Sequence, residues 1–150
     1  MEVGIRPVTS KDWGFILDLR NQSYVRLACH DTSTIDSESH RKYMERLEKD
    51  PKSYQWIVSC DGNDVGHVKI VSGELGYMLK SEYHGKGIGT TFHKLVFEEA
   101  KKVGLRKLTD TIKVDNLSSL KLAIRMGFKQ KELQYKNGVP YSYCLEKNLK

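Results

Sequence analysis

Apolar positions recur with two different periods along this chain, and each period predicts one type of element. Alternating or β-branched segments predict strands, which we place at residues 3–8, 54–60, 65–71, 74–79, 107–114, 131–136 and 141–146. Apolar residues spaced by three and four predict helices, which we place near residues 13–19, 40–48, 88–103 and 117–124. Residues 23–35 follow neither period, so we expect a loop or a short irregular helix there.

Capping and turn residues fall between these elements. Ser10 and Asp36 stand where they can cap the first two helices. Hairpin signals occur at Asp61-Gly62-Asn63, Ser72-Gly73 and Asn137-Gly138. We therefore expect an antiparallel meander of three strands over residues 54–79, or four with the N-terminal strand. The order of elements predicts one mixed α/β or α+β domain over residues 1–150.

Composition narrows the setting of the protein. The 150 residues carry a formal net charge of +6, which favours an anionic ligand, but no basic run or aromatic stripe predicts nucleic-acid binding. No apolar run could span a membrane and the N-terminus lacks signal-peptide features, so we expect a cytoplasmic protein. Cys29, Cys60 and Cys144 are far apart, so neither a metal site nor a disulfide framework is indicated.

Glycine occupies every second position of the segment between the strand at 74–79 and the helix at 88–103. The first amides of a helix have no intrahelical partner and lie at its positive end, so such a turn is suited to a phosphate or pyrophosphate. Thr90 stands where the dinucleotide-binding fingerprint has its third glycine, and the Lys-Ser/Thr pair of the triphosphate-binding loop is absent. An anion site is predicted, with a tight turn that binds nothing as the alternative.

Two segments together resemble the GNAT superfamily of acetyl-CoA-dependent N-acetyltransferases, and the resemblance covers nearly the whole chain. The segment at 83–89 is similar to the family's pyrophosphate loop, with Gly87 and Gly89 in place and His84 where Arg or Gln is usual. The segment at 114–128 is similar to the family's Asn-x-x-Ala/Ser stretch and terminal Gly-Phe. The resemblance implies a central, mostly antiparallel twisted sheet with a parallel pair at a V-shaped cofactor cleft, flanked by about four helices.

The resemblance also implies where acetyl-CoA binds. The main chain of Met78 and Leu79 would pair with the pantetheine arm, and one of these two N–H groups would polarise the thioester carbonyl. The remaining cofactor contacts that the resemblance implies are His84, Gly85, Lys86, Gly87, Ile88, Gly89, Thr90, Asn116 and Ser119. Because His84 supplies a neutral or weakly charged ring where Arg or Gln is usual, backbone amides should carry more of the phosphate binding than side chains do.

An acceptor ammonium must lose a proton before it can attack, and a nearby carboxylate is the usual base. The resemblance implies Glu74, which lies ten residues before His84 on the preceding strand. A solvent-facing role for Glu74 is the alternative, and Asp110 and His67 are further candidates for the base. The family's usual proton donor is a tyrosine, and its position holds Ala123. Its substitutes are water or one of the tyrosines of the last hairpin, Tyr135, Tyr141 and Tyr143.

The N-terminal half should carry the acceptor. Arg20, Asn21, Arg26 and His40 resemble a branch that acetylates amino sugars on nucleotide carriers. That resemblance implies that an arginine meets phosphates and that Asn21 bonds the sugar, whereas a helix end with solvated arginines is the alternative. The expected partner is a small-molecule amine, with no membrane, no nucleic acid and no metal, and a homodimer is left open. The alternatives are acetylation of a protein N-terminus or lysine, and a non-catalytic acyl-CoA-binding module.

Overall fold

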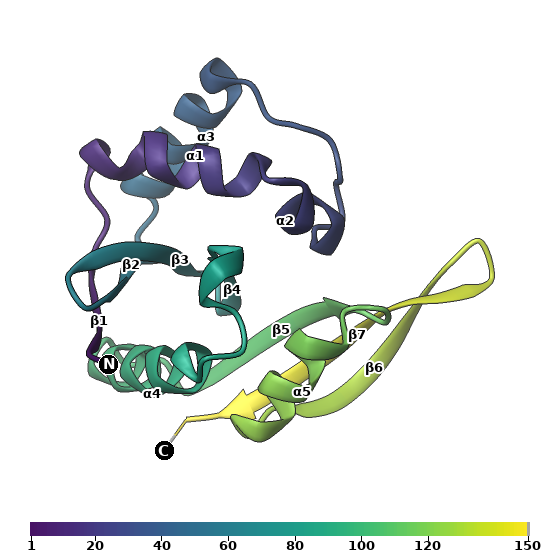
Figure 1. Ribbon diagram of the computed structural model, residues 1–150. Coiled ribbons are helices and arrows are strands. Elements are labelled where there is room, and N and C mark those ends of the chain that lie inside the picture. The colour runs from purple at the N-terminus through teal and green to yellow at the C-terminus, as the bar shows by residue number, and fades with distance from the viewer. Residues whose placement is uncertain (150) are drawn as a thin grey trace.

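A seven-stranded sheet in the order β1-β2-β3-β4-β5-β7-β6 organises residues 1–149, the part that the computed structural model describes (Figure 1). Its strands are β1 (Val3–Pro7), β2 (Ser53–Cys60), β3 (Asn63–Val71), β4 (Glu74–Leu79), β5 (Lys107–Lys113), β6 (Lys129–Lys136) and β7 (Val139–Asn148). Every neighbouring pair is antiparallel except β4 and β5. The predicted mixed fold and its mostly antiparallel sheet are therefore confirmed.

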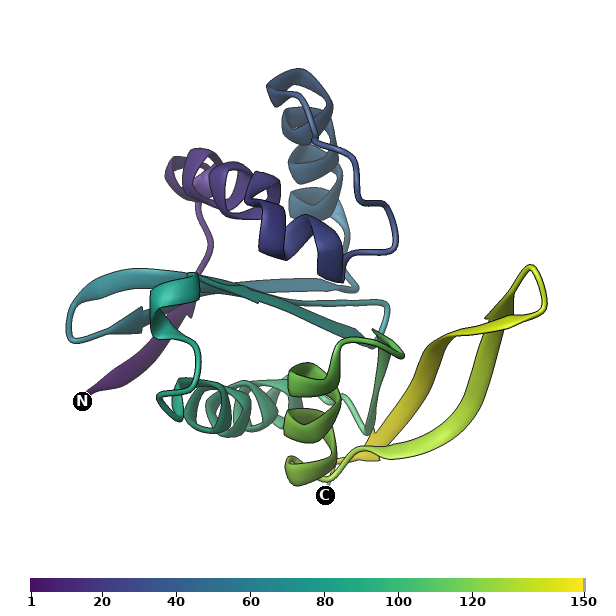
Figure 2. The same cartoon turned by 45° about the vertical axis from the view of Figure 1, so that its right-hand side comes forward.

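Helices cover both faces of the sheet. They are α1 (Trp13–Asn21), α2 (Ser23–Ala28), α3 (Ser37–Lys49), α4 (Ile88–Lys102) and α5 (Leu117–Arg125), with short 3-10 turns at Ser10–Asp12 and Ser81–Tyr83. Figure 2 shows α1, α2 and α3 on one face, α4 and α5 on the other, and the β6–β7 hairpin extending away from the body. The described residues thus form five α-helices, one more than the expected number. None of these helices is both long and apolar enough to cross a membrane.

Three tight turns set the register of the antiparallel strands. Asp61-Gly62, Ser72-Gly73 and Asn137-Gly138 all have positive φ, between 49° and 83°. Two successive positive φ values are typical of the type I′ turn, whose twist matches that of the strands it joins. The predicted three-strand meander, β2 to β4, follows from the first two turns, and the last hairpin follows from the third. β1 extends the meander to four strands by pairing antiparallel with β2.

The two predicted helix caps have different outcomes. Asp36 caps α3 as expected, and its carboxylate accepts a bond from Ser39 N at 2.8 Å. Ser10 is not a cap, because it already lies inside the first 3-10 turn and Thr9 precedes it as the N-cap. The Asp12 carboxylate accepts from Thr9 N at 2.8 Å while Arg6 holds it at 2.8 and 2.9 Å. The capping box between Thr9 and Asp12 therefore starts the turn one residue earlier than expected, and Arg6 fixes the Asp12 carboxylate.

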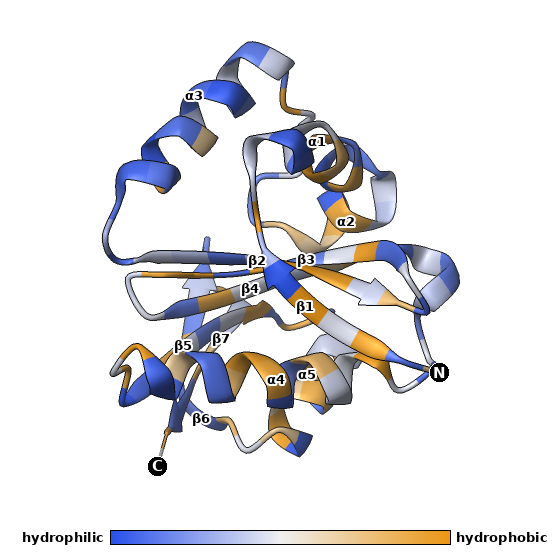
Figure 3. Ribbon diagram, turned by 90° about the vertical axis from the view of Figure 1, so that its left-hand side faces the viewer, coloured by the Kyte–Doolittle hydropathy of each residue, from blue (hydrophilic) through white to orange (hydrophobic). Residues whose placement is uncertain are grey.

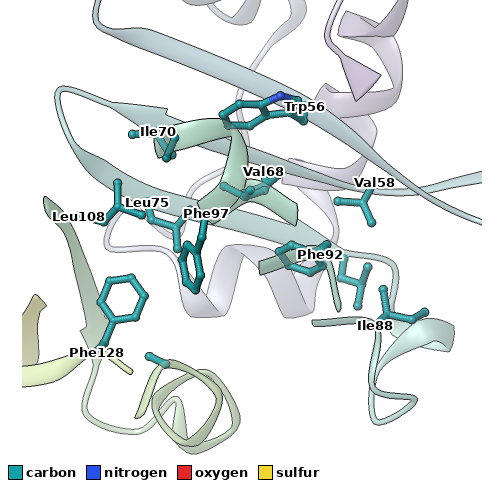
Figure 4. Packing of buried hydrophobic residues seen from close by; sticks show 14 of the residues in the cluster. Trp56, Val58, Val68, Ile70, Leu75, Ile88, Phe92, Phe97, Leu108 and Phe128 are labelled. Carbon is teal, nitrogen blue, oxygen red and sulfur yellow. The ribbon is translucent and has the colours of Figure 1, made fainter. Parts of the chain in front are cut away.

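The main core lies between the sheet and helices α4 and α5. Figure 4 shows Phe92 and Phe97 of α4 packed with Leu75, Leu108 and Phe128 from the sheet and its connections. A smaller core of Ile16, Met44, Leu47 and Ile57 lies under α1 and α3 on the other face. Figure 3 shows the corresponding apolar sides of α1 and α4 directed toward the sheet. Burial from both faces explains why the central strands are rich in β-branched residues.

The strands β4 and β5 lie side by side only where they begin. Glu74 and Thr109 form the single parallel pair between them, and Thr109 N donates to Gly73 O at 2.9 Å. Beyond that pair the two strands separate, so each has a backbone edge that the other does not pair. The resulting V-shaped opening confirms the predicted parallel pair, and it brings the candidate site residues together.

Candidate functional site

The V-shaped opening between β4 and β5 has two chemically different faces. Leu75, Tyr77 and Leu79 point toward the core under α4 and α5, whereas Met78 packs against the core under α1 and α3. The α4–α5 face and the α1–α3 face of the opening are therefore lined by alternate residues of β4, as the period of a strand requires. The apex is the Glu74–Thr109 pair, and the mouth is the glycine segment after β4.

The glycines of that segment serve two purposes. Gly85 and Gly87 have φ of 73° and 79°, and a Cβ at either would meet no atom within 4 Å. Glycine is thus required at both by backbone conformation, and the space outside the segment is open. Gly89 lies within α4, where a Cβ would approach Leu122 Cδ2 of α5 to 2.6 Å. It permits close contact of the two helices.

The predicted anion site therefore has the necessary form. Gly87 is the N-cap of α4, a helix of 15 residues, and within residues 1–149 no side chain accepts from its first amides. Those amides are available to a negatively charged group at the positive end of the helix. Lys86 is exposed beside them, with its Nζ 5.5 Å from the centre of the Tyr83 ring. Both features suit a phosphate, and neither requires the arginine that His84 replaces.

His84 is engaged with the protein itself. Its Nε2 donates to Leu79 O at 3.0 Å, and its ring meets the edge of Tyr24 with centroids 5.4 Å apart. The hydroxyl of Tyr24 donates to the same carbonyl at 2.8 Å. His84 thus ties the glycine segment to the end of β4, while Leu79 O already has two donors. The predicted phosphate contact of His84 and pairing of Leu79 with pantetheine stay predictions.

Asn116 and Ser119 lie at the start of α5, across the opening from β4. Asn116 is the N-cap of α5, and its side chain accepts from Ser119 N at 3.4 Å. The Ser119 hydroxyl lies 3.0 Å from the hydroxyl of Tyr77. The Tyr77 ring rests edge-on against Phe92, with centroids 5.3 Å apart. Burial raises the pKa of Tyr77, the charge of Asp110 acts in the same direction, and the Ser119 bond opposes both.

Two carboxyl groups flank the apex in different surroundings. Glu74 is exposed, and its Oε1 accepts from the Thr111 hydroxyl at 3.0 Å. Asp110 is 7% exposed, and no side chain among the described residues hydrogen-bonds its carboxyl. Burial raises the pKa of Asp110 to about 7, the charge of Glu74 adds to the effect, and the Thr111 backbone opposes it. His67, the other candidate base, is buried and bonds Gln55 Oε1 at 2.9 Å, a packing role.

On the α1–α3 side of the opening, Tyr141, one of the tyrosines considered as proton donor, lies beside polar residues that the sequence did not single out. His30 Nε2 lies 2.6 Å from the Ser142 hydroxyl, and the Tyr141 hydroxyl donates to His30 O at 3.3 Å. Lys113 is 9% exposed and its Nζ donates to Leu27 O at 3.0 Å. Burial lowers the pKa of His30, and Lys113 and Lys136 act in the same direction while Glu74 opposes them. His30 is therefore a neutral hydrogen-bonding group at neutral pH.

A cavity lies beside these residues, between the loop after α2 and the β6–β7 hairpin. Its volume is about 630 Å³, and its lining is His30, Glu132, Leu133, Gln134, Tyr135, Lys136 and Tyr141. The lining mixes one carboxylate with a lysine, an imidazole and two phenols. Its size lies within the range of small-molecule sites. Residues 30 and 141 come from distant parts of the chain, so no local pattern could reveal this cavity.

The three predicted acceptor contacts organise the loop that carries His30. Arg20 donates to Asp31 O at 2.8 Å, and Arg26 Nε donates to Asn21 O at 3.0 Å. Asn21 makes two 2.8 Å bonds to the backbone of Ile35, as donor through Nδ2 and as acceptor through Oδ1. These contacts favour an indirect role in which Arg20, Asn21 and Arg26 hold the loop in place. Direct contact with an acceptor stays a prediction.

Comparison with known proteins agrees with this geometry. Residues 2–129 match the family described as "Acetyltransferase (GNAT) domain". "Probable N-acetyltransferase YjcK" of Bacillus subtilis (strain 168) is 27% identical over 151 residues, covering 89% of this chain and 83% of that protein.

Solved structures share the fold. Spermidine N-acetyltransferase from Vibrio cholerae, in complex with CoA and spermine, matches with a TM-score of 0.86 and 17% identity over 98% of this chain and 95% of that chain. The structure of yncA from Salmonella typhimurium, with its cofactor acetyl-CoA, matches with a TM-score of 0.82 and 17% identity over 99% of this chain and 94% of that chain.

Proposed function

Since the chain belongs to the GNAT family and is an acetyl-CoA-dependent N-acetyltransferase, we propose that its acceptor is the primary amine of a small molecule. The cavity of about 630 Å³ between the loop after α2 and the last hairpin carries this proposal. It lies between His30 and β6, and the charge of Glu74, at the V-shaped opening, acts on the His30 imidazole. This pocket is shallow and open, and its volume has room for a compact acceptor.

The residues at the mouth of the opening fit coenzyme A. The free amides at the start of α4 and the exposed Lys86 suit its pyrophosphate. The unpaired edge of β4 beyond Glu74 suits the amides of the pantetheine arm. Asn116 and Ser119 line the opposite wall at the start of α5. When bound, acetyl-CoA supplies the activated acetyl group as a thioester.

Glu74 is the proposed base for the acceptor ammonium. It is exposed, its charge acts on His30 at the edge of the cavity, and the Thr111 hydroxyl orients one of its oxygens at 3.0 Å. A carboxylate held there removes a proton from the ammonium directly or through one water molecule, which frees the nitrogen lone pair for attack. An N–H group of Met78 or Leu79 is the proposed donor to the thioester oxygen.

A peptide acceptor is the second candidate, and one observation favours it. β6 is an edge strand of the sheet, and nearly all of its side chains are exposed. An extended peptide can add to such an edge through main-chain bonds, so acetylation of a protein N-terminus or lysine is retained. A non-catalytic acyl-CoA-binding module is the third candidate, favoured by Ala123 at the usual position of the family's tyrosine. The amino-sugar branch also stays a proposal, because the side chains of Arg20 and Asn21 bond the backbone.

Free-thiol release from acetyl-CoA tests the proposal against a panel of polyamines, aminoglycosides, nucleotide-linked amino sugars and short peptides. We expect saturable release with at least one small amine, and loss of that release with the same compound N-acetylated in advance. Release with peptides alone would establish the second candidate. No release with any acceptor, combined with a thermal shift on adding acetyl-CoA, would identify a binding module.

The setting of the reaction completes the proposal. Cys29, Cys60 and Cys144 are all free thiols, which suits a reducing compartment such as the cytoplasm. A homodimer stays a prediction, and sedimentation of the purified chain with and without acetyl-CoA measures it.

A further inference from the structure

Asp110 is a buried acid that the proposed base chemistry does not use. It is 7% exposed and none of the described side chains hydrogen-bonds it. A buried carboxyl destabilises a fold when its charged form loses hydration with little compensation, and within residues 1–149 the Thr111 backbone is the only group that favours the charged form of Asp110. Packing therefore gives no reason for an aspartate between the buried side chains of Leu108 and Ile112.

The position of Asp110 relates it directly to the transfer chemistry. It follows Thr109, the β5 partner of Glu74 at the apex, so it is the first residue of β5 beyond the point where the strands separate. Leu108 and Ile112 belong to the core under α4 and α5, and the alternation of a strand turns Asp110 to that same face. Glu74 and Thr111 bond each other on the opposite face. The apex thus carries one carboxyl on each face.

The two faces correspond to the two ends of the reaction. The glycine segment and the start of α5 adjoin the α4–α5 face, so an arm that extends from the mouth along β4 directs its thioester toward the apex on that side. The acceptor cavity lies on the other side, beside His30. The leaving sulfur is therefore expected near Asp110, and the attacking nitrogen near Glu74.

We propose that Asp110 is a catalytic residue that protonates the leaving sulfur of coenzyme A, an assignment that rests on the proposed acetyl transfer. The C–N bond forms as the carbon–sulfur bond breaks, and the bonding electron pair stays on sulfur, which takes the proton of the neutral Asp110 carboxyl. The ammonium gives up two protons in all: Glu74 passes one to solvent, and the other, through solvent, restores Asp110. The products are the N-acetyl amine, coenzyme A with a free thiol, and one released proton.

The surroundings of Asp110 favour it over Tyr77 as the donor. The charges of Glu74 and Asp110 act on each other, and Asp110 also acts on Tyr77 of β4. His93 of α4 lies beyond Tyr77, with the two ring centroids 5.2 Å apart. On the β7 side, the register partner of Asp110 is the apolar Leu145. An ordinary thiol has a pKa of about 8.5, so a carboxyl with a pKa of about 7 gives its proton to a thiolate readily. The pKa of Tyr77 is raised instead, and its hydroxyl is already bonded to Ser119.

The test compares Asp110→Asn with Tyr77→Phe in steady-state thiol release, using the best acceptor of the panel. General acid catalysis contributes roughly 10²-fold to 10⁴-fold, so we expect kcat of Asp110→Asn to fall by about 100-fold or more. KM for acetyl-CoA should change by less than about threefold, and Tyr77→Phe should keep most of its kcat. Asp115→Asn removes an exposed carboxylate nearby and serves as the charge-matched control.

The pH profile separates proton donation from a purely structural role. Wild-type kcat should decline as the pH rises through the pKa of Asp110, because the donor form is lost, whereas Asp110→Asn should lack this decline. The acceptor titrates identically in both proteins, so the difference isolates Asp110. Wild-type kcat and an unchanged profile in Asp110→Asn would overturn the proposal, as would a large loss in Tyr77→Phe alone. Should Asp110→Asn fail to fold, Asp110→Glu should retain the declining limb. A wild-type protein inactive with every acceptor would instead refute the proposed function and this assignment with it.

Discussion

The unfolding free energy of the Asp110→Asn variant should depend on pH differently from that of the wild type. Burial raises the pKa of Asp110 from 3.8 to about 7 in the folded chain. Below about pH 4 the Asp110 carboxyl is neutral in both the folded and the unfolded chain, so its ionisation takes nothing from the free energy of unfolding. Between pH 4 and 7 the unfolded chain ionises first, and stability is lost. Above pH 7 the loss is complete.

The size of this loss follows from the shift. One pKa unit corresponds to about 1.4 kcal/mol, and the shift from 3.8 to about 7 is roughly three units, so ionisation of Asp110 costs about 4 kcal/mol of stability by linkage. An asparagine amide carries no titrating proton, and its own burial cost is the same at every pH. The difference in unfolding free energy, variant minus wild type, should therefore rise by about 4 kcal/mol between pH 4 and pH 8.

Urea denaturation followed by circular dichroism at pH 4, 6 and 8 measures this difference. The other carboxylates titrate in both proteins and cancel in the subtraction. Asp115→Asn, which removes an exposed carboxylate, should show no comparable rise. Glu74→Gln removes the charge that contributes to the raised pKa of Asp110, so the pH-dependent loss should shrink in that background. A difference that stays within about 0.5 kcal/mol across the three pH values would refute the argument from burial.

Three further outcomes follow from the site. Glu74→Gln should lower kcat by about 100-fold, the scale of general base catalysis, with acetyl-CoA affinity unchanged by calorimetry; activity equal to the wild type would remove Glu74 as the base. Gly87→Ala should lower the affinity for acetyl-CoA far more than His84→Ala, because a φ of 79° costs a residue with a Cβ about 1–2 kcal/mol. Equal losses of affinity in calorimetric titrations of the two variants would contradict this. Gly89→Ala should destabilise the fold by about 1 kcal/mol through contact with Leu122, as measured by urea denaturation; the same loss in a Leu122→Ala background would rule out that contact as the cause.

The glycine segment illustrates what local sequence predicts well. Its conformation depends on φ at Gly85 and Gly87, and the sequence shows directly where side chains are absent. The type I′ turns and the Asp36 cap are also short-range, because each involves atoms only a few residues apart. Glu74, Met78, Leu79 and the start of α5 lie at the V-shaped opening, whereas the contacts of His84 and Arg20 with the backbone were not anticipated. The roles of the site residues stay predictions.

The sequence by itself therefore determined the order of elements, the turns, the position of the glycine segment and the family. Only the tertiary structure decided which side chains meet. His30 and Ser142 lie 112 residues apart in the chain, and no periodic pattern links them. His93 and Phe97 of α4 are both buried, His93 although it is polar, because α4 contacts both the sheet and the elements beside it.

Asp110 shows the same limit most clearly. In the sequence it is a polar residue in a strand, for which exposure is the ordinary expectation. Whether that strand turns the residue to solvent or into the opening depends on how β5 pairs with its neighbours. Asp110 pairs with Leu145 of β7, and Thr109 pairs with Glu74 of β4. A shift of one residue would turn Asp110 to the other face. Its burial, its raised pKa and its place opposite Glu74 are consequences of strand pairing, which the sequence does not encode locally.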